Sequence, residues 1–178
     1  MIRLLVNMVV FIILTVIQTS FISSLPSIFV YTPFLLAVAI FIIQQTGNRS
    51  GLAWIIVFGV YLDLFSISVF PFETLSFLAC AMSATLVSER LFSNRSWYGL
   101  IACGMTGILA LSLTRSLILF FSSVWSHSQP SLLESWFVFK WNSILLMIIL
   151  TILFALTRPL RRFLTASFVL MKQQETLN

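Results

Sequence analysis

The sequence predicts an all-α membrane protein, a bundle of six transmembrane helices. Three observations favour this fold class. Hydrophobic residues make up 60% of the 178-residue chain and charged residues 8%, and the mean hydropathy is +1.07. The apolar residues form long continuous runs rather than the short alternating segments of a membrane β-barrel. Lysine and arginine also gather at alternate breaks between these runs.

Six apolar runs approach the length of about 20 residues that a helix needs to cross the hydrocarbon core. The first run follows Arg3, and the second follows the segment Ser-Ser-Leu-Pro at residues 23–26. Asn-Arg-Ser triplets precede the third and fifth runs, the turn at Pro71 precedes the fourth, and a serine-rich segment precedes the sixth. The predicted spans are residues 4–21, 27–44, 52–69, 75–91, 97–122 and 135–157.

The basic residues orient the predicted bundle, because positive charges near span ends accumulate on the cytoplasmic side of a membrane. The opposite loops contain Glu73, His127 and Glu134 but neither lysine nor arginine. Both ends of the chain are therefore expected in the cytoplasm, with residues 1–162 as the transmembrane domain and residues 163–178 as a short basic tail. The expected cytoplasmic anchors are Arg49, Arg95, Arg158, Arg161 and Arg162.

The triplet Asn-Arg-Ser occurs twice, at residues 48–50 and 94–96, each time directly before an apolar run. Asparagine and serine are favoured as helix N-caps, so each copy is expected to begin a helix. A match of three residues is too short to indicate an internal repeat. We therefore interpret the two copies as a coincidence with a shared capping role.

The sequence contains no recognisable catalytic or metal-binding pattern. A single histidine, His127, cannot form a zinc site alone, and no phosphate loop, dinucleotide-binding glycine pattern or close carboxylate pair occurs. Cys80 and Cys103 fall within predicted helices and are expected to be small packing residues. The net charge of +5 suits the anionic inner membrane surface rather than nucleic acid. We expect a non-enzymatic protein without cofactors.

Asp63 lies within the third predicted span, where an ionised carboxylate is costly unless it is paired. Its side chain is too short to reach water. Gly59, Asp63 and Ser66 share one helical face, which is expected to turn toward another helix. An Asp63–Arg115 ion pair is the leading hypothesis, because both residues fall in the outer half of the predicted bilayer. The alternative is a protonated carboxyl that hydrogen-bonds to a neighbouring helix.

Two cations also lie within predicted spans. Lys140 is close enough to the outer end of the sixth span for its long side chain to reach the interface. Arg115, in the fifth span, can either reach the interface in the same way or turn inward to pair. Depth therefore leaves the role of Arg115 open.

The fourth and fifth spans contain small residues at the spacing that allows helices to pack closely. Gly99, Cys103 and Gly107 recur at four-residue intervals, and Cys80 and Ala84 repeat the pattern. Such stripes let helix backbones approach one another. We expect the fourth and fifth helices to be in close contact with neighbours.

The segment GVYLDLFSISVFPFETLSFL, residues 59–78, resembles the MreD family, the rod shape-determining membrane proteins of bacteria. In that family a glycine-containing helix ends in Asp-Leu-hydrophobic-Ser and is followed by a proline-containing turn and a new helix. The matching residues are Gly59, Asp63, Leu64, Ser66, Pro71, Phe72 and Leu75. Glu73 completes the turn motif Pro71, Phe72 and Glu73, where the family commonly has glycine. Pro33 and Leu35 similarly match the start of the family's second helix.

The resemblance implies a non-enzymatic scaffold of the cell-wall elongation machinery, a multi-pass protein of the bacterial cytoplasmic (inner) membrane. The implied partners are an MreC-like protein, wall-synthesis membrane proteins and, indirectly, an MreB-like filament. Glu73, Glu134 and the arginines of residues 158–162 are the expected contact points outside the bilayer.

An alternative function is the substrate-binding membrane subunit of an energy-coupling-factor vitamin importer, which is also a small six-helix protein. Asp63, Glu73, Arg115 and Lys140 can line an outward-facing polar pocket. Such subunits share an Ala-xxx-Ala face on an early helix, whereas the first span here contains neither alanine nor glycine. A third possibility is a lipid-binding or lipid-flipping bundle, which requires an amphipathic groove.

Overall fold

Helices make up nearly all of the described chain, and no strand occurs in the residues that the computed structural model describes. These residues are 2–25, 27–46, 50–66, 70–91, 96–126 and 132–175, with backbone alone for some terminal turns, including residues 158–175. The predicted all-α fold class is confirmed. The helices are α1 (Ile2–Val16), η1 (Ile17–Phe21), η2 (Ile22–Ser24), η3 (Ser27–Tyr31), α2 (Phe34–Thr46), α3 (Ser50–Ser66), α4 (Phe72–Arg90), α5 (Trp97–Ser126) and α6 (Leu132–Glu175).

Each predicted span coincides with a helical segment, but two differ from expectation. The second span is divided between η3 and α2, because Pro33 has no N–H group and disfavours the helical conformation of Thr32. The sixth helix continues to Glu175 instead of ending near residue 157, so the expected tail begins as part of α6. Continuous apolar sequence predicts where along the chain a helix lies better than it predicts where that helix ends.

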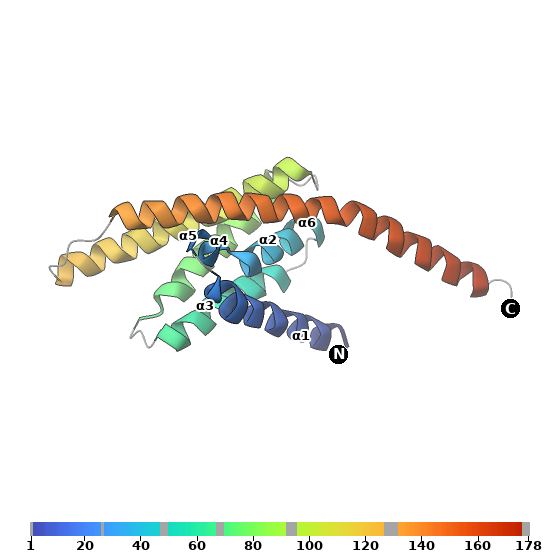
Figure 1. Ribbon diagram of the computed structural model, residues 1–178, viewed down its shortest axis with the longest axis horizontal. Helices are drawn as coiled ribbons and strands as arrows, with labels where there is room; N and C mark the ends of the chain where they lie inside the picture. The colour runs from blue at the N-terminus through green and yellow to red at the C-terminus, as the bar shows by residue number, and fades with distance from the viewer. Residues whose placement is uncertain are drawn as a thin grey trace.

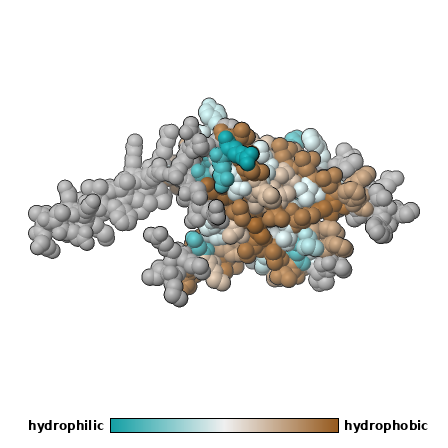
Figure 2. Space-filling view, turned by 180° about the vertical axis from the view of Figure 1, so that it is seen from behind, coloured by the Kyte–Doolittle hydropathy of each residue, from teal (hydrophilic) through white to brown (hydrophobic). Residues whose placement is uncertain are grey.

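Among the described residues, three segments are long and apolar enough to cross a membrane: Asn7–Ser24, Trp97–Phe121 and Trp136–Thr157. Two further apolar helical segments, Phe29–Gln44 and Ser50–Ser66, are shorter. Large hydrophobic side chains are also exposed on many helices, and Figure 2 shows apolar surface across much of one face, with smaller hydrophilic areas. These features are compatible with a membrane protein.

Successive helices run back and forth across the molecule. In Figure 1 the start of α1 and the end of α6 both lie toward the right, whereas the end of α5 and the start of α6 lie at the left. α4 packs between α3 and α5, and α2 contacts α3, α5 and α6. α1 contacts α2 and α3 and exposes Leu5, Met8 and Val9.

The core lies among α2 to α6, and its fully buried side chains come from all five helices. Aliphatic residues dominate, with two buried free cysteines from α4 and α5. The thiol of Cys103 lies 3.2 Å from Oε1 of buried Gln44 and donates to it. The largest of these buried side chains are Leu35, Ile40, Ile55, Leu100, Leu146, Leu150, Cys80 and Cys103.

Small residues lie where α5 meets α4. A Cβ atom at Gly107 would lie 3.2 Å from the sulfur of Cys80 and 3.9 Å from Cβ of Ala84. Gly99 is buried and its N–H donates to Oγ of Ser96, 3.2 Å away. Ser96 therefore caps α5 as the second Asn-Arg-Ser triplet predicts.

α3 and α4 approach each other closely at Gly59. A Cβ atom there would lie 2.9 Å from Cβ of Phe77, 3.0 Å from Cα of Thr74 and 3.3 Å from the carbonyl oxygen of Glu73. Two of these three neighbours are backbone atoms, which cannot move aside by a side-chain rotation. The hydrogen atom of glycine is what allows the two helices to meet.

We expect Gly59→Leu to destabilise the protein by about 1–3 kcal/mol, because the new side chain must push α4 away from α3. Thermal unfolding in mild detergent measures the change. Ala53→Leu is the matched control, since Ala53 is an exposed residue of the same helix, and it should change stability by less than about 0.5 kcal/mol. Equal effects of the two substitutions would contradict a tight contact at Gly59.

Candidate functional site

The N-terminus of α4 begins at a proline. Pro71 occupies the N-cap position and makes no side-chain capping bond. The first intrahelical bond runs from the N–H of Leu75 to the carbonyl of Pro71 at 3.1 Å, and the N–H of Phe72 donates to the carbonyl of Phe70 at 2.9 Å. The N–H groups of the next two residues have no carbonyl partner within the helix. They need an acceptor from elsewhere.

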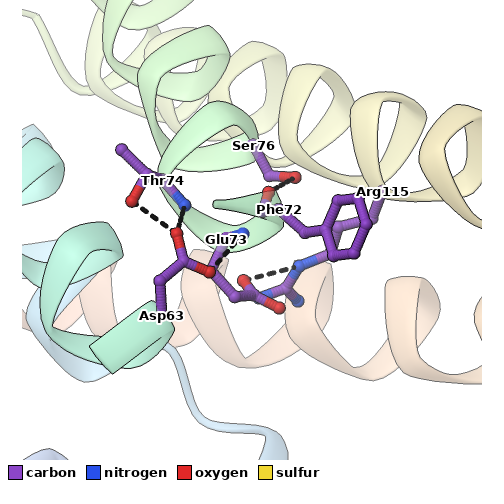
Figure 3. Close-up of polar contacts among 6 residues, drawn as sticks. All are labelled: Asp63, Phe72, Glu73, Thr74, Ser76 and Arg115. Atoms are coloured by element: carbon purple, nitrogen blue, oxygen red, sulfur yellow. Dashed lines mark hydrogen bonds and ion pairs between the residues drawn. The ribbon is translucent and has the colours of Figure 1, made fainter. Parts of the chain in front are cut away.

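Asp63 of α3 supplies that acceptor (Figure 3). Its Oδ1 accepts the N–H of Glu73 at 2.9 Å, and its Oδ2 accepts the N–H of Thr74 at 2.7 Å. The hydroxyl of Thr74 donates to the same Oδ2. Asp63 thus performs the role of an N-cap side chain from a neighbouring helix, and its negative charge lies at the positive end of the α4 dipole.

Arg115 of α5 pairs with Glu73 and not with Asp63, so the expected Asp63–Arg115 pair is wrong. Both Nε and Nη2 donate to Oε2 of Glu73, and the Nε bond is 3.1 Å long. The Cζ atom of Arg115 also lies 5.7 Å from the ring centroid of Phe77, within the range of a cation–π contact. Glu73 was expected in a loop but lies in the first turn of α4, where the dipole favours an acidic residue.

The polar contacts therefore join three helices in one network. α3 contributes Asp63, α4 contributes Glu73 and Thr74, and α5 contributes Arg115. Each acidic oxygen that takes part accepts from a group on another helix. The arrangement holds the first turn of α4 between α3 and α5.

The other residues singled out in the sequence do not join this network. Ser66 is exposed and bonds locally to the carbonyl of Asp63 at 3.1 Å. Lys140 is exposed and makes no hydrogen bond or ion pair with any described residue. Arg49, Arg95 and His127 lie outside the described residues, and for four others on α6 the structure describes only the backbone. Those four are Glu134, Arg158, Arg161 and Arg162.

A cavity of about 800 Å³ adjoins the network on the side of Arg115. Its lining comes from the segment after α1, from η3 and from parts of α2 to α6. Apolar side chains such as Phe58, Leu62 and Ile108 line it together with hydroxyl and amide groups. The polar contributors are Gln18, Thr19, Ser23, Tyr31, Thr32, Ser112, Arg115, Ser116 and Asn142.

Gln18 positions the chain at one edge of the cavity. Its Nε2 donates to the carbonyl of Thr32 at 2.9 Å, and its Oε1 accepts the N–H of Leu35 at 3.2 Å. These two bonds satisfy backbone groups on either side of Pro33, where the helix is interrupted. Gln18 was not singled out from the sequence. The signal that could have indicated its role is an amide side chain near the end of an apolar run, followed in the next run by a proline that interrupts a helix.

The described residues contain no cluster of three histidine, cysteine, aspartate or glutamate side chains suited to a metal ion. The bonds at Asp63 and Glu73 are made to groups of the protein itself, so the network acts on structure. The cavity is a place among the described residues where a further molecule has room.

Comparisons with protein-family models, with curated proteins and with solved structures gave no match. The fold and the site define an all-helical protein whose apolar helices are compatible with a membrane location.

We expect Asp63→Ala to lower the free energy of unfolding by about 1–2 kcal/mol, because two N–H groups of α4 lose their acceptor. Asp63→Asn should lower the free energy of unfolding by less than Asp63→Ala does, since the amide oxygen can still accept one of these bonds. Unfolding in mixed detergent measures both. Glu89→Ala removes an exposed carboxylate from the same α4 and should leave stability nearly unchanged; a comparable loss there would argue against the cap.

A double-mutant cycle distinguishes the observed ion pair from the expected one. The pair Glu73→Gln and Arg115→Gln should show a coupling energy of about 0.5–1 kcal/mol, because both groups are partly exposed. The pair Asp63→Asn and Arg115→Gln should show a smaller coupling. The reverse order of the two coupling energies would mean that Arg115 responds chiefly to Asp63.

Proposed function

We propose that this protein is a non-enzymatic, MreD-like scaffold of the bacterial cell-wall elongation machinery, embedded in the cytoplasmic (inner) membrane. The observation that carries the proposal is the structure of the segment that resembles the MreD family. Within it Gly59 allows α3 to meet α4, and Asp63 caps the helix that begins after Pro71. The aspartate and the proline turn thus form one unit, which gives a physical reason for their occurrence together.

The proposed topology is a six-span bundle with both ends in the cytoplasm. Two features support it: each predicted span coincides with a helical segment, and the start of α1 lies on the same side of the molecule as the end of α6. The shorter α2 is extended by η3, which lengthens that segment to Phe29–Gln44. The distribution of lysine and arginine then assigns the cytoplasmic side.

A scaffold of this kind acts through lateral helix surfaces. α1 is the best exposed of the long apolar segments, with Leu5, Met8 and Ile12 at its surface. Helix surfaces of this type associate by packing and interhelical hydrogen bonds within the bilayer. The proposed partners are an MreC-like protein and wall-synthesis membrane proteins, with an MreB-like filament reached through them.

The importer subunit is the second candidate, and the cavity is the observation in its favour. A volume of about 800 Å³ with hydroxyl and amide groups in its lining falls within the range of small-molecule sites. The Ala-xxx-Ala face of such subunits has no counterpart in α1, whose sequence from Ile2 to Val16 contains no alanine.

Co-purification tests the choice between the two. The full-length chain, tagged and co-expressed with the MreC-like protein of the same genome, should retain that protein through purification in mild detergent. A variant with Ala53→Leu, an exposed substitution on α3, should retain it equally. Rod shape should also return when the pair is expressed in cells depleted of their own MreD and MreC proteins.

Retention of a coupling ATPase without any MreC-like protein would overturn the scaffold proposal in favour of the importer subunit. The gene neighbourhood gives a parallel test, since a scaffold gene should lie beside genes for an MreC-like protein and for wall synthesis. Proximity to transporter ATPase genes would instead favour the importer subunit.

A further inference from the structure

The cavity beside Arg115 is open to the surface of the protein. Its volume of about 800 Å³ lies within the roughly 300–1,000 Å³ of small-ligand sites. The helices therefore leave room for a molecule the size of a lipid chain with its headgroup.

The lining combines two kinds of side chain. Phe58, Leu62 and Phe77 of α3 and α4 contribute apolar surface. α5 contributes Ser112, Arg115 and Ser116, which lie within about one helical turn of each other and so share one face. A ligand that satisfies both parts must be amphipathic.

Arg115 is the charged residue of this lining, and Glu73 does not belong to it. Glu73 accepts two N–H groups of the guanidinium on a single oxygen. A guanidinium has five N–H donors, so this pairing leaves capacity for a second acidic group. Charge-assisted bonds from arginine to carboxylate or phosphate are among the stronger polar contacts in proteins.

α6 contributes one polar group to the lining. The amide of Asn142 lies there beside the apolar side chains of Val138 and Phe139. This wall of the cavity is therefore also mixed in character.

We propose that this cavity binds one anionic amphiphile, with the acidic headgroup at Arg115, Ser112 and Ser116 and the hydrocarbon chain against Phe58, Leu62 and Phe77. The shared chemistry is a carboxylate or phosphate attached to a hydrocarbon chain, from either a fatty acid or an acidic membrane lipid. The site goes beyond the scaffold function and does not depend on it, because binding is measured on the isolated protein.

Native mass spectrometry of the full-length protein tests the site. The probes are oleate, a phosphatidylglycerol and a phosphatidylcholine with the same acyl chains, with inorganic phosphate as the acid without a chain. We expect one equivalent of an acidic amphiphile to bind at least tenfold more tightly than the phosphatidylcholine. Stronger binding of oleate would identify a fatty-acid site, and stronger binding of phosphatidylglycerol a phospholipid site.

Matched variants locate the binding. Arg115→Gln should weaken acidic binding at least tenfold, whereas Lys140→Gln removes a cation from an exposed position of α6 and should not. Ser112→Phe should block the cavity while leaving the Glu73–Arg115 pair in place, so it tests the site even if Arg115→Gln fails to fold. Leu113→Phe, at a neighbouring position that is 61% exposed, is its control.

Three results would overturn the proposal. Equal binding of the phosphatidylcholine would remove the role of the acidic group, and binding of inorganic phosphate alone would remove the role of the chain. Equal loss of binding in Ser112→Phe and Leu113→Phe would place the amphiphile on the outer helix surface. None of these results bears on retention of an MreC-like protein, so failure of the site and failure of the scaffold are distinguishable.

Discussion

The carboxylate of Asp63 at the N-terminus of α4 is the interaction on which the surrounding structure depends. A helix that begins at a proline has backbone N–H groups to satisfy and no side chain at its cap to satisfy them. In apolar surroundings such groups are costly to leave unpaired. The solution here is an acceptor from α3, with one carboxylate oxygen for each N–H group. The contact is possible because Gly59, one turn earlier on α3, lets the two backbones approach.

The rest of the site follows from the position of this cap. Once Asp63 is engaged by backbone groups, Glu73 is the acid that remains for Arg115, and its place in the first turn of α4 directs the ion pair toward α5. Arg115 is thereby held beside Phe77 and at the wall of the cavity. One capped turn thus determines both where the cation lies and how much of its hydrogen-bonding capacity is already used.

The sequence predicts the helices well and their polar contacts only in part. Continuous apolar runs locate all six helical segments, because such runs have few other stable structures. The depth argument correctly requires a partner for Asp63 and includes a hydrogen bond to a neighbouring helix as one alternative, but it does not identify the N–H groups of Glu73 and Thr74 as the donors. Glu73 was assigned to a loop because it precedes the apolar run of the fourth span. The cavity is beyond sequence reasoning, since Gln18, Ser112 and Asn142 come together only when separate helices pack.

The remote cap also bears on how the protein is assembled. In most helices the capping residue directly precedes the helix in sequence, so the helix can be capped without contact with another helix. α4 instead depends on a residue of the preceding helix for its first turn. In the proposed six-span topology, separate entry of the two helices into the bilayer would bring the first turn of α4 into lipid with two donors unpaired. That topology therefore requires α3 and α4 to insert together as a hairpin, with Asp63 already bound to α4.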